Sequence, residues 1–69
     1  MASHTSRHHR KPRSLGGITS KENISYIGEE KHRCWHELFH NWTPDKICRE
    51  INEKYLDPEY MLICIKREE

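Results

Sequence analysis

The uneven placement of apolar residues is the feature that most constrains how this chain can fold. Residues 1–21 contain one pair of large aliphatic side chains, Leu15 and Ile18, whereas the aromatic residues all lie between Tyr26 and Tyr60. A hydrophobic core can therefore form only from about residue 24 onward. With 69 residues, the chain is one domain at most, and a domain of this size buries only about 60% of its unfolded surface. We expect the first residues to be disordered, or to be held by a metal or a partner.

Charge is distributed as unevenly as the apolar residues. Residues 1–21 carry five bases and no acid, whereas residues 22–69 carry seven bases and eleven acids. A basic arm beside an acidic body favours a polyanion such as nucleic acid as the partner of the arm. The alternative is a solvated tail without a partner. We assign residues 1–7 to a flexible basic tail, residues 8–42 to the functional motif and residues 43–69 to an extension that completes the core.

The cysteines argue against a disulfide framework. They are Cys34, Cys48 and Cys64, an odd number with no Cys-x-x-Cys pair. A reducing cytoplasm fits this usage best, and we interpret all three as packing residues. No apolar run follows Met1, and no segment approaches the roughly 18 apolar residues of a membrane span. We therefore expect a cytoplasmic protein with no signal peptide and no membrane contact.

Residues 8–42 have the pattern of a hairpin followed by a helix. Pro12 and the Gly16-Gly17 pair indicate a turn or long loop, and the run from Asn23 to Ile27 alternates as a short strand does. Two acidic residues then follow Gly28, as in the first turn of a helix. Apolar side chains next recur at spacings of three and four, which predicts an amphipathic helix over residues 30–41. These are Trp35, Leu38, Phe39 and Trp42.

The C-terminal third predicts a second helix and an ambiguous end. Thr43 and Pro44 form a strong helix start, with a capping hydroxyl and a proline at the first helical position. This helix should extend to about Tyr55. Residues 60–65 are rich in β-branched side chains and favour a terminal strand, although a third helix is the alternative. Together these elements predict a small α+β domain.

Histidines and one asparagine make the most informative chemical pattern. His8 and His9 are adjacent, Asn23 follows 14 residues later, and His32 and His36 lie one helical turn apart. Two histidines at i and i+4 project from one face of a helix and can share one metal ion. His8 from the first strand would complete a three-histidine site with an open coordination position, as catalytic sites have. The alternatives are ordinary surface histidines, or a closed structural zinc site in which His40 is the fourth ligand.

The stretch from His8 to His36 resembles the HNH nucleases, also called ββα-metal nucleases, and especially the branch that includes the colicin nucleases. Many HNH sequences begin with Asp-His and continue with a proline, a serine, a Gly-Gly pair, an asparagine and a helix histidine. The colicin-like branch has a histidine in place of that aspartate and a His-x-x-x-His pair on the helix. This chain supplies His8-His9, Pro12, Ser14, Gly16-Gly17, Asn23-Ile24, His32 and His36 in the same order.

The resemblance implies a ββα-metal core, extended here by a C-terminal helix and a possible terminal strand, and a set of residue roles. His8, His32 and His36 would bind one divalent ion, which zinc, nickel, magnesium or manganese could supply. His9 would be the general base that activates water, and Asn23 would orient the hairpin and the His9 ring. Basic side chains beside the histidines would contact DNA phosphates without reading sequence. These are Arg7, Arg10, Lys11 and Arg13.

The implied activity is metal-dependent hydrolysis of DNA phosphodiester bonds. The chain departs from many HNH domains in lacking Cys-x-x-Cys pairs, because Gly28 and Lys31 stand where one would precede His32. It also shows no separate DNA-binding domain, so we expect weak sequence specificity or direction by a protein partner. The resemblance, together with the small size, implies a phage or mobile-element product, and a phage-encoded protein would lie in the host cytoplasm. The alternative is a catalytically silent module of the same fold that binds DNA or a protein.

Overall fold

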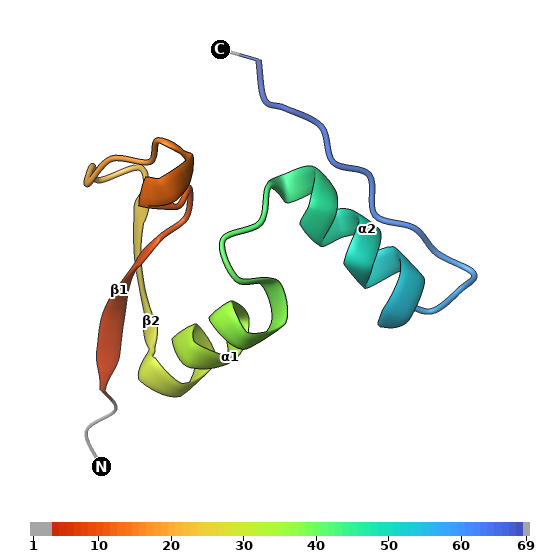
Figure 1. The fold of residues 1–69 in the computed structure, drawn as a ribbon, viewed down its shortest axis with the longest axis horizontal. Helices are drawn as coiled ribbons and strands as arrows, with labels where there is room; N and C mark the ends of the chain where they lie inside the picture. The colour runs from red at the N-terminus through yellow and green to blue at the C-terminus, as the bar shows by residue number, and fades with distance from the viewer. Residues whose placement is uncertain (1–3, 69) are drawn as a thin grey trace.

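The computed structural model describes residues 4–68 and has the α+β architecture that the sequence predicts (Figure 1). Two strands form a hairpin, a short 3-10 helix lies in the loop between them, and two helices follow. The elements in chain order are β1 (Thr5–His9), η1 (Arg13–Leu15), β2 (Ile24–Gly28), α1 (Glu29–Phe39) and α2 (Pro44–Lys54). None of the helices in this described part is long and apolar enough to cross a membrane.

The hairpin begins earlier than the sequence indicates. β1 and β2 pair antiparallel from Thr5 opposite Gly28 to His9 opposite Ile24, and the amide of Glu29 adds a 3.0 Å bond to the carbonyl of His4. The prediction that residues 1–7 form a flexible tail is therefore wrong for residues 5–7, while residues 1–3 lie outside the described residues. The physical reason is that all five residues of β2 need backbone partners, and a strand starting at His8 would satisfy too few of them.

The first helix follows the second strand without a loop. α1 occupies residues 29–39, close to the predicted 30–41, and has Glu29 and Glu30 in its first turn. The helix stops at His40, whose φ of 49° is incompatible with a right-handed helix. In Figure 1 this helix lies across from the hairpin, and it packs against both strands.

The hydrophobic core is very small. Among residues 4–68, Phe39 is the one buried apolar side chain, at 6% exposed, and the Trp35 ring meets it edge to face at 4.7 Å. The cysteines add little, because Cys34 and Cys64 are exposed and Cys48 is half-buried, so the packing role predicted for the first two is wrong. Burial of apolar area alone therefore provides little stability.

The second helix lies apart from the hairpin and α1 (Figure 1). It starts at Pro44 as predicted, but Thr43 makes no capping hydrogen bond with its side chain. The terminal strand favoured for residues 60–65 is wrong: the segment has no regular structure and runs back beside α2. The side chain of Asn52 in α2 bonds to the backbone of Leu62: it accepts from the Leu62 amide at 2.8 Å and donates to the Leu62 carbonyl at 2.9 Å. The segment thus lies against a helix, where no strand edge offers a ladder of partners.

Candidate metal centre and its cleft

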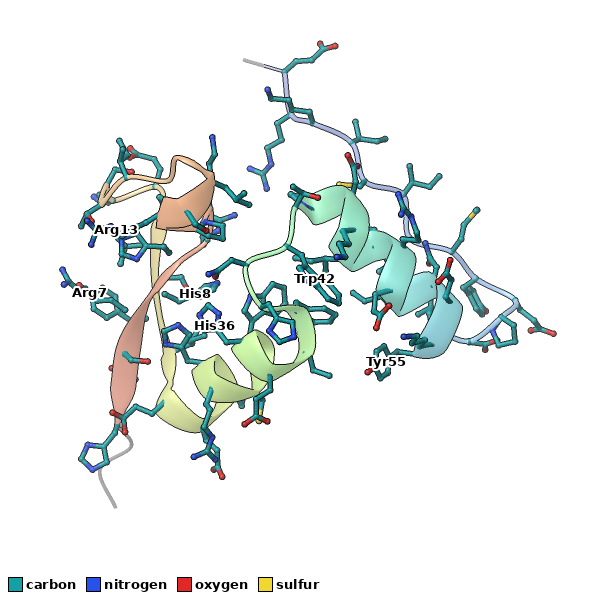
Figure 2. The ribbon with its side chains drawn as sticks, in the orientation of Figure 1. Arg7, His8, Arg13, His36, Trp42 and Tyr55 are labelled. Atoms are coloured by element: carbon teal, nitrogen blue, oxygen red, sulfur yellow. The ribbon has the colours of Figure 1, made fainter. Side chains whose placement is uncertain are left out.

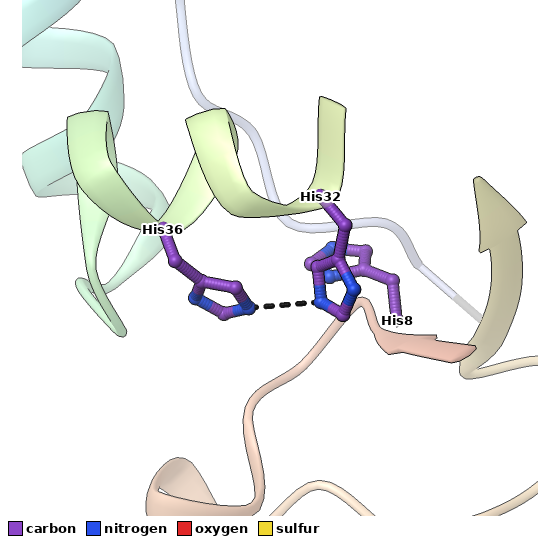
Figure 3. Close-up of side chains that lie close together, drawn as sticks. All are labelled: His8, His32 and His36. Atoms are coloured by element: carbon purple, nitrogen blue, oxygen red, sulfur yellow. Dashed lines mark hydrogen bonds between the residues drawn. The ribbon is translucent and has the colours of Figure 1, made fainter. Parts of the chain in front are cut away.

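Three histidines from the strand and the helix converge between β1 and α1. One ring nitrogen from each of His8, His32 and His36 lies within 4.8 Å of the others (Figure 3). His32 and His36 meet because four residues make about one turn of α1, and their Nε2 atoms are 3.0 Å apart. His8 reaches them because its side chain projects from the face of β1 that α1 covers, as Figure 2 shows. The sequence predicted this grouping.

The nitrogen spacing fits one divalent ion. Two metal–nitrogen bonds of about 2.1 Å at a tetrahedral angle separate their nitrogens by about 3.4 Å. The 3.0 Å pair is slightly closer than that spacing, and all separations in the group lie within 4.8 Å, so small side-chain rotations would bring the three nitrogens to it. No fourth His, Cys, Asp or Glu from residues 4–68 joins the group. The set is therefore an open three-imidazole site of the kind that zinc or nickel accepts.

Outer partners turn two of these rings inward. The Nδ1 of His32 lies 2.6 Å from the Ser6 hydroxyl, and the Nδ1 of His36 lies 3.3 Å from the carbonyl of His40. Because a carbonyl only accepts, His36 must donate from Nδ1, which leaves its Nε2 lone pair facing His32. The 3.0 Å contact between the two Nε2 atoms is then a hydrogen bond that His32 donates, and the Nδ1 of His32 accepts from the Ser6 hydroxyl. If Ser6 instead accepted from Nδ1, both Nε2 lone pairs would be available to one ion. Such hydrogen bonds fix the tautomer and orientation of metal-binding imidazoles.

The backbone of His40 takes part in this arrangement, whereas its ring does not. Its positive φ of 49° is rare for a residue other than glycine, and the turn that it makes brings its carbonyl within reach of His36. The His40 ring instead packs on Trp42, with ring centres 5.4 Å apart. The alternative of a closed zinc site with His40 as fourth ligand is therefore wrong. Strained backbone beside candidate ligands is a recurring property of functional sites.

His8 is the buried member of the group. It is 9% exposed, and its Nδ1 has no hydrogen-bond partner. Burial lowers its pKa below the ordinary 6.5, and the nearby His32 and His36 lower it further. His8 is therefore held in the neutral form that binds metals, and its unpaired buried nitrogen is a polar group that a cation would satisfy.

A cleft of about 280 Å³ opens beside the histidine group. His32 and His36 line it together with His9, so the base candidate shares one cavity with two metal-ligand candidates. The Nε2 of His9 is 3.0 Å from the hydroxyl of Thr19. His9 thus lines this cleft, whereas its neighbour His8 does not.

Asn23 fixes the loop that carries these groups. Its carboxamide oxygen accepts the amide of Lys11 at 2.7 Å, and its nitrogen donates to the carbonyls of Lys11 and Ile18 at 3.1 and 2.8 Å. The predicted role in holding the hairpin agrees with this geometry, whereas the His9 ring bonds Thr19 and not Asn23. A side chain at Gly17 would collide with the carbonyl of Lys11, so the loop closes only with glycine there.

The four basic residues divide between two cavities. Arg7 and Arg13 line the cleft beside the histidines, where a phosphate would meet both charges. Arg10 and Lys11 instead line a second cavity, and Arg10 donates a 3.1 Å bond to the carbonyl of Glu22. The sequence treated these residues as one arm. Only Arg7 lies in β1, whereas Arg10 and Lys11 follow the strand and Arg13 lies in η1, so the four side chains do not share one face.

Sequence reasoning missed Ser6, Thr19 and the carbonyl of His40. Ser6 sits two residues before His8 and so projects from the same face of β1, which was the one available signal. Thr19 lies in an irregular loop, where spacing predicts no contact.

Comparison with known proteins finds no relative: no family model, no curated protein and no solved structure matches the chain.

Proposed function

We propose that this protein is a metal-dependent endonuclease of the HNH, or ββα-metal, type that hydrolyses phosphodiester bonds in DNA. The observation that carries the proposal is the open three-histidine group, two of whose members, His32 and His36, line one cleft together with a fourth histidine and two arginines. An ordinary surface offers no reason for a buried, unpaired imidazole nitrogen beside two inward-facing ones. The order of these residues in the sequence, which resembles that of HNH nucleases, also supports the proposal.

The chain's own residues can carry the steps of phosphodiester hydrolysis. Arg7 and Arg13 would hold the phosphate, and His9 would take the proton of the attacking water at Nδ1, since Thr19 engages Nε2. The water oxygen then bonds to phosphorus while the bond to the departing sugar oxygen breaks. A divalent ion on His8, His32 and His36 would stabilise charge on the phosphate and on the departing oxygen.

The test is cleavage of supercoiled plasmid by the purified protein with Mg²⁺, Mn²⁺, Ni²⁺ or Zn²⁺, beside an EDTA control. We expect nicking or linearisation that needs the metal and falls by at least about 100-fold in His9→Ala, the scale of a lost general base. His4→Ala is the matched control, because His4 is an exposed histidine outside the cleft.

Metal binding without cleavage under any condition would favour the alternative of a catalytically silent module that binds DNA or a protein. One feature favours a protein partner in either case. Large apolar side chains stay exposed along the C-terminal segment, as contact surfaces for other proteins do. They are Tyr60, Met61, Leu62, Ile63 and Ile65.

We also propose that the protein acts in a reducing compartment such as a host cytoplasm, where its free cysteines stay reduced.

A further inference from the structure

A second and larger cavity lies on the other side of the loop that follows β1. Its volume is about 590 Å³, within the range of small-molecule sites. Three segments and Trp35 of α1 build its walls: the segments are residues 10–15, residues 40–47 and residues 64–66. Pro12 lines both this cavity and the histidine cleft, so the two are neighbours across one turn of the chain. The hydrolytic steps above use none of its aromatic or basic side chains.

The wall of this cavity favours a negatively charged ligand. Arg10, Lys11 and Lys66 line it, against a single acid, Asp45. The hydrogen bond from Arg10 to the carbonyl of Glu22 holds that guanidinium in place while leaving its charge without a carboxylate partner. An excess of positive charge in a concave wall attracts phosphates.

The same wall presents aromatic rings. Trp35, His40 and Trp42 line the cavity, and Figure 2 shows Trp42 between α1 and α2. Lys46 does not line the cavity, yet its Nζ lies 4.4 Å from the centre of the Trp42 ring. The His40 ring lies 5.4 Å from the half-buried Trp42 ring at a tilt of 47°, so a bound planar group would stack on the part of the indole that Lys46 and His40 leave open. Aromatic rings beside cationic side chains are the combination with which proteins bind unpaired bases.

We propose that this cavity binds an unstacked nucleobase of single-stranded DNA, with the adjoining backbone on Arg10, Lys11 and Lys66. A base in a duplex is stacked on both faces and cannot enter, so the site selects single-stranded or locally unpaired substrate. The placement next to the histidine cleft rests on the proposed function, because it puts the bound base beside the phosphate to be cleaved. Binding of the base itself needs neither metal nor cleavage.

The test is binding of fluorescent oligodeoxynucleotides by anisotropy in EDTA, which stops any cleavage. One sequence is compared as a single strand, as a duplex and as a single strand with abasic sites. We expect the intact single strand to bind at least about tenfold more tightly than the abasic strand of equal charge, the scale of one stacked base. Equal affinity for intact and abasic strands would overturn the proposal.

Two variants locate the binding. Trp42→Ala should remove the preference for the intact strand while leaving duplex binding within about twofold. Tyr55→Ala should change neither, because Tyr55 follows the end of α2 and is exposed outside both cavities. An equal loss for single strand and duplex in a folded Trp42→Ala protein would contradict the proposal. If circular dichroism shows that this variant unfolds, Lys66→Gln, at an exposed position, replaces it and should weaken single-strand binding.

The two proposals fail separately. If the protein prefers the intact single strand in EDTA but never cleaves plasmid, the base-binding proposal holds and the nuclease proposal is wrong. If the protein cleaves plasmid but binds intact and abasic strands alike, the nuclease proposal holds and the base-binding proposal is wrong.

Discussion

Each half of this molecule uses an asparagine side chain to hold an irregular segment, but the surroundings of the two asparagines differ. In residues 4–42, Asn23 makes three bonds to the backbone of Lys11 and Ile18, and α1 packs on both strands of the hairpin. In residues 43–68, Asn52 makes two bonds to the backbone of Leu62, and α2 stands apart from the other elements. The first amide completes a site, whereas the second fastens an otherwise exposed segment to one helix.

This difference indicates where the stability of the chain comes from. Neither half has a core of useful size, since Phe39 and His8 are the buried side chains in the described range. The N-terminal half can gain from a bound ion, because three of its side chains point at one place. The C-terminal half has no such group among its described residues, so we expect the two halves to respond differently to metal.

The largest expected effect is therefore that of metal on the N-terminal half. At a free Zn²⁺ or Ni²⁺ concentration 100 times the dissociation constant, one site adds about 2.7 kcal/mol of stability. Hydrogen exchange should slow in β1, β2 and α1 and change little in α2. His8→Ala should lower the metal affinity by at least about 100-fold by calorimetry, and His40→Ala should leave it within a few-fold. Equal protection of α2 by metal would break the comparison.

A second experiment sets the two asparagines against each other. Asn23→Ala removes three hydrogen bonds and should lower the free energy of unfolding by about 2–3 kcal/mol. Asn52→Ala removes two bonds at the edge of the molecule and should cost about 1 kcal/mol. Urea denaturation measures both, with metal chelated. A larger loss for Asn52→Ala would show that the C-terminal half, and not the site, holds the molecule together.

The smallest expected effect is the pH dependence of the metal-free protein. His8 has a pKa below 6.5 in the folded state, so the unfolded chain takes up its proton first as the pH falls. Stability from this group is complete above pH 6.5 and is lost as the pH drops through 6.5 toward the lower folded pKa. Urea midpoints measured in EDTA between pH 8 and pH 5 should fall in that window. His8→Leu should flatten the curve, and an unchanged slope in that variant would assign the effect to other groups.

The sequence predicted the parts of this molecule that depend on local periodicity. The spacing of His32 and His36 placed both on one helix face, Pro44 set the start of α2 to the residue, and the order of His8 and the helix pair predicted their meeting. These inferences work because a helical turn and a strand alternation are fixed by backbone geometry. The activity proposed from them stays a prediction until cleavage is measured.

The parts that the sequence did not predict depend on contacts between distant segments. Residues 60–65 have the composition of a strand. However, the Asn52 side chain bonds to the backbone of Leu62, and no strand edge lies beside this segment in the described part of the chain. Thr19 reaches His9 through an irregular loop, and nothing in local spacing reports such a contact. The division of Arg7 from Arg10 likewise depended on where β1 ends.

The close approach of Gly17 to the backbone of Lys11 governs how far this chain can diverge without losing its site. Any side chain there would push Lys11 away from Asn23, and the loop that aligns Thr19 with His9 would open. Gly28 faces open space and tolerates replacement. Descendants of this sequence are therefore free to change much of the surface outside the two cavities, while the second glycine of the loop marks those lineages in which the histidine cleft is still assembled.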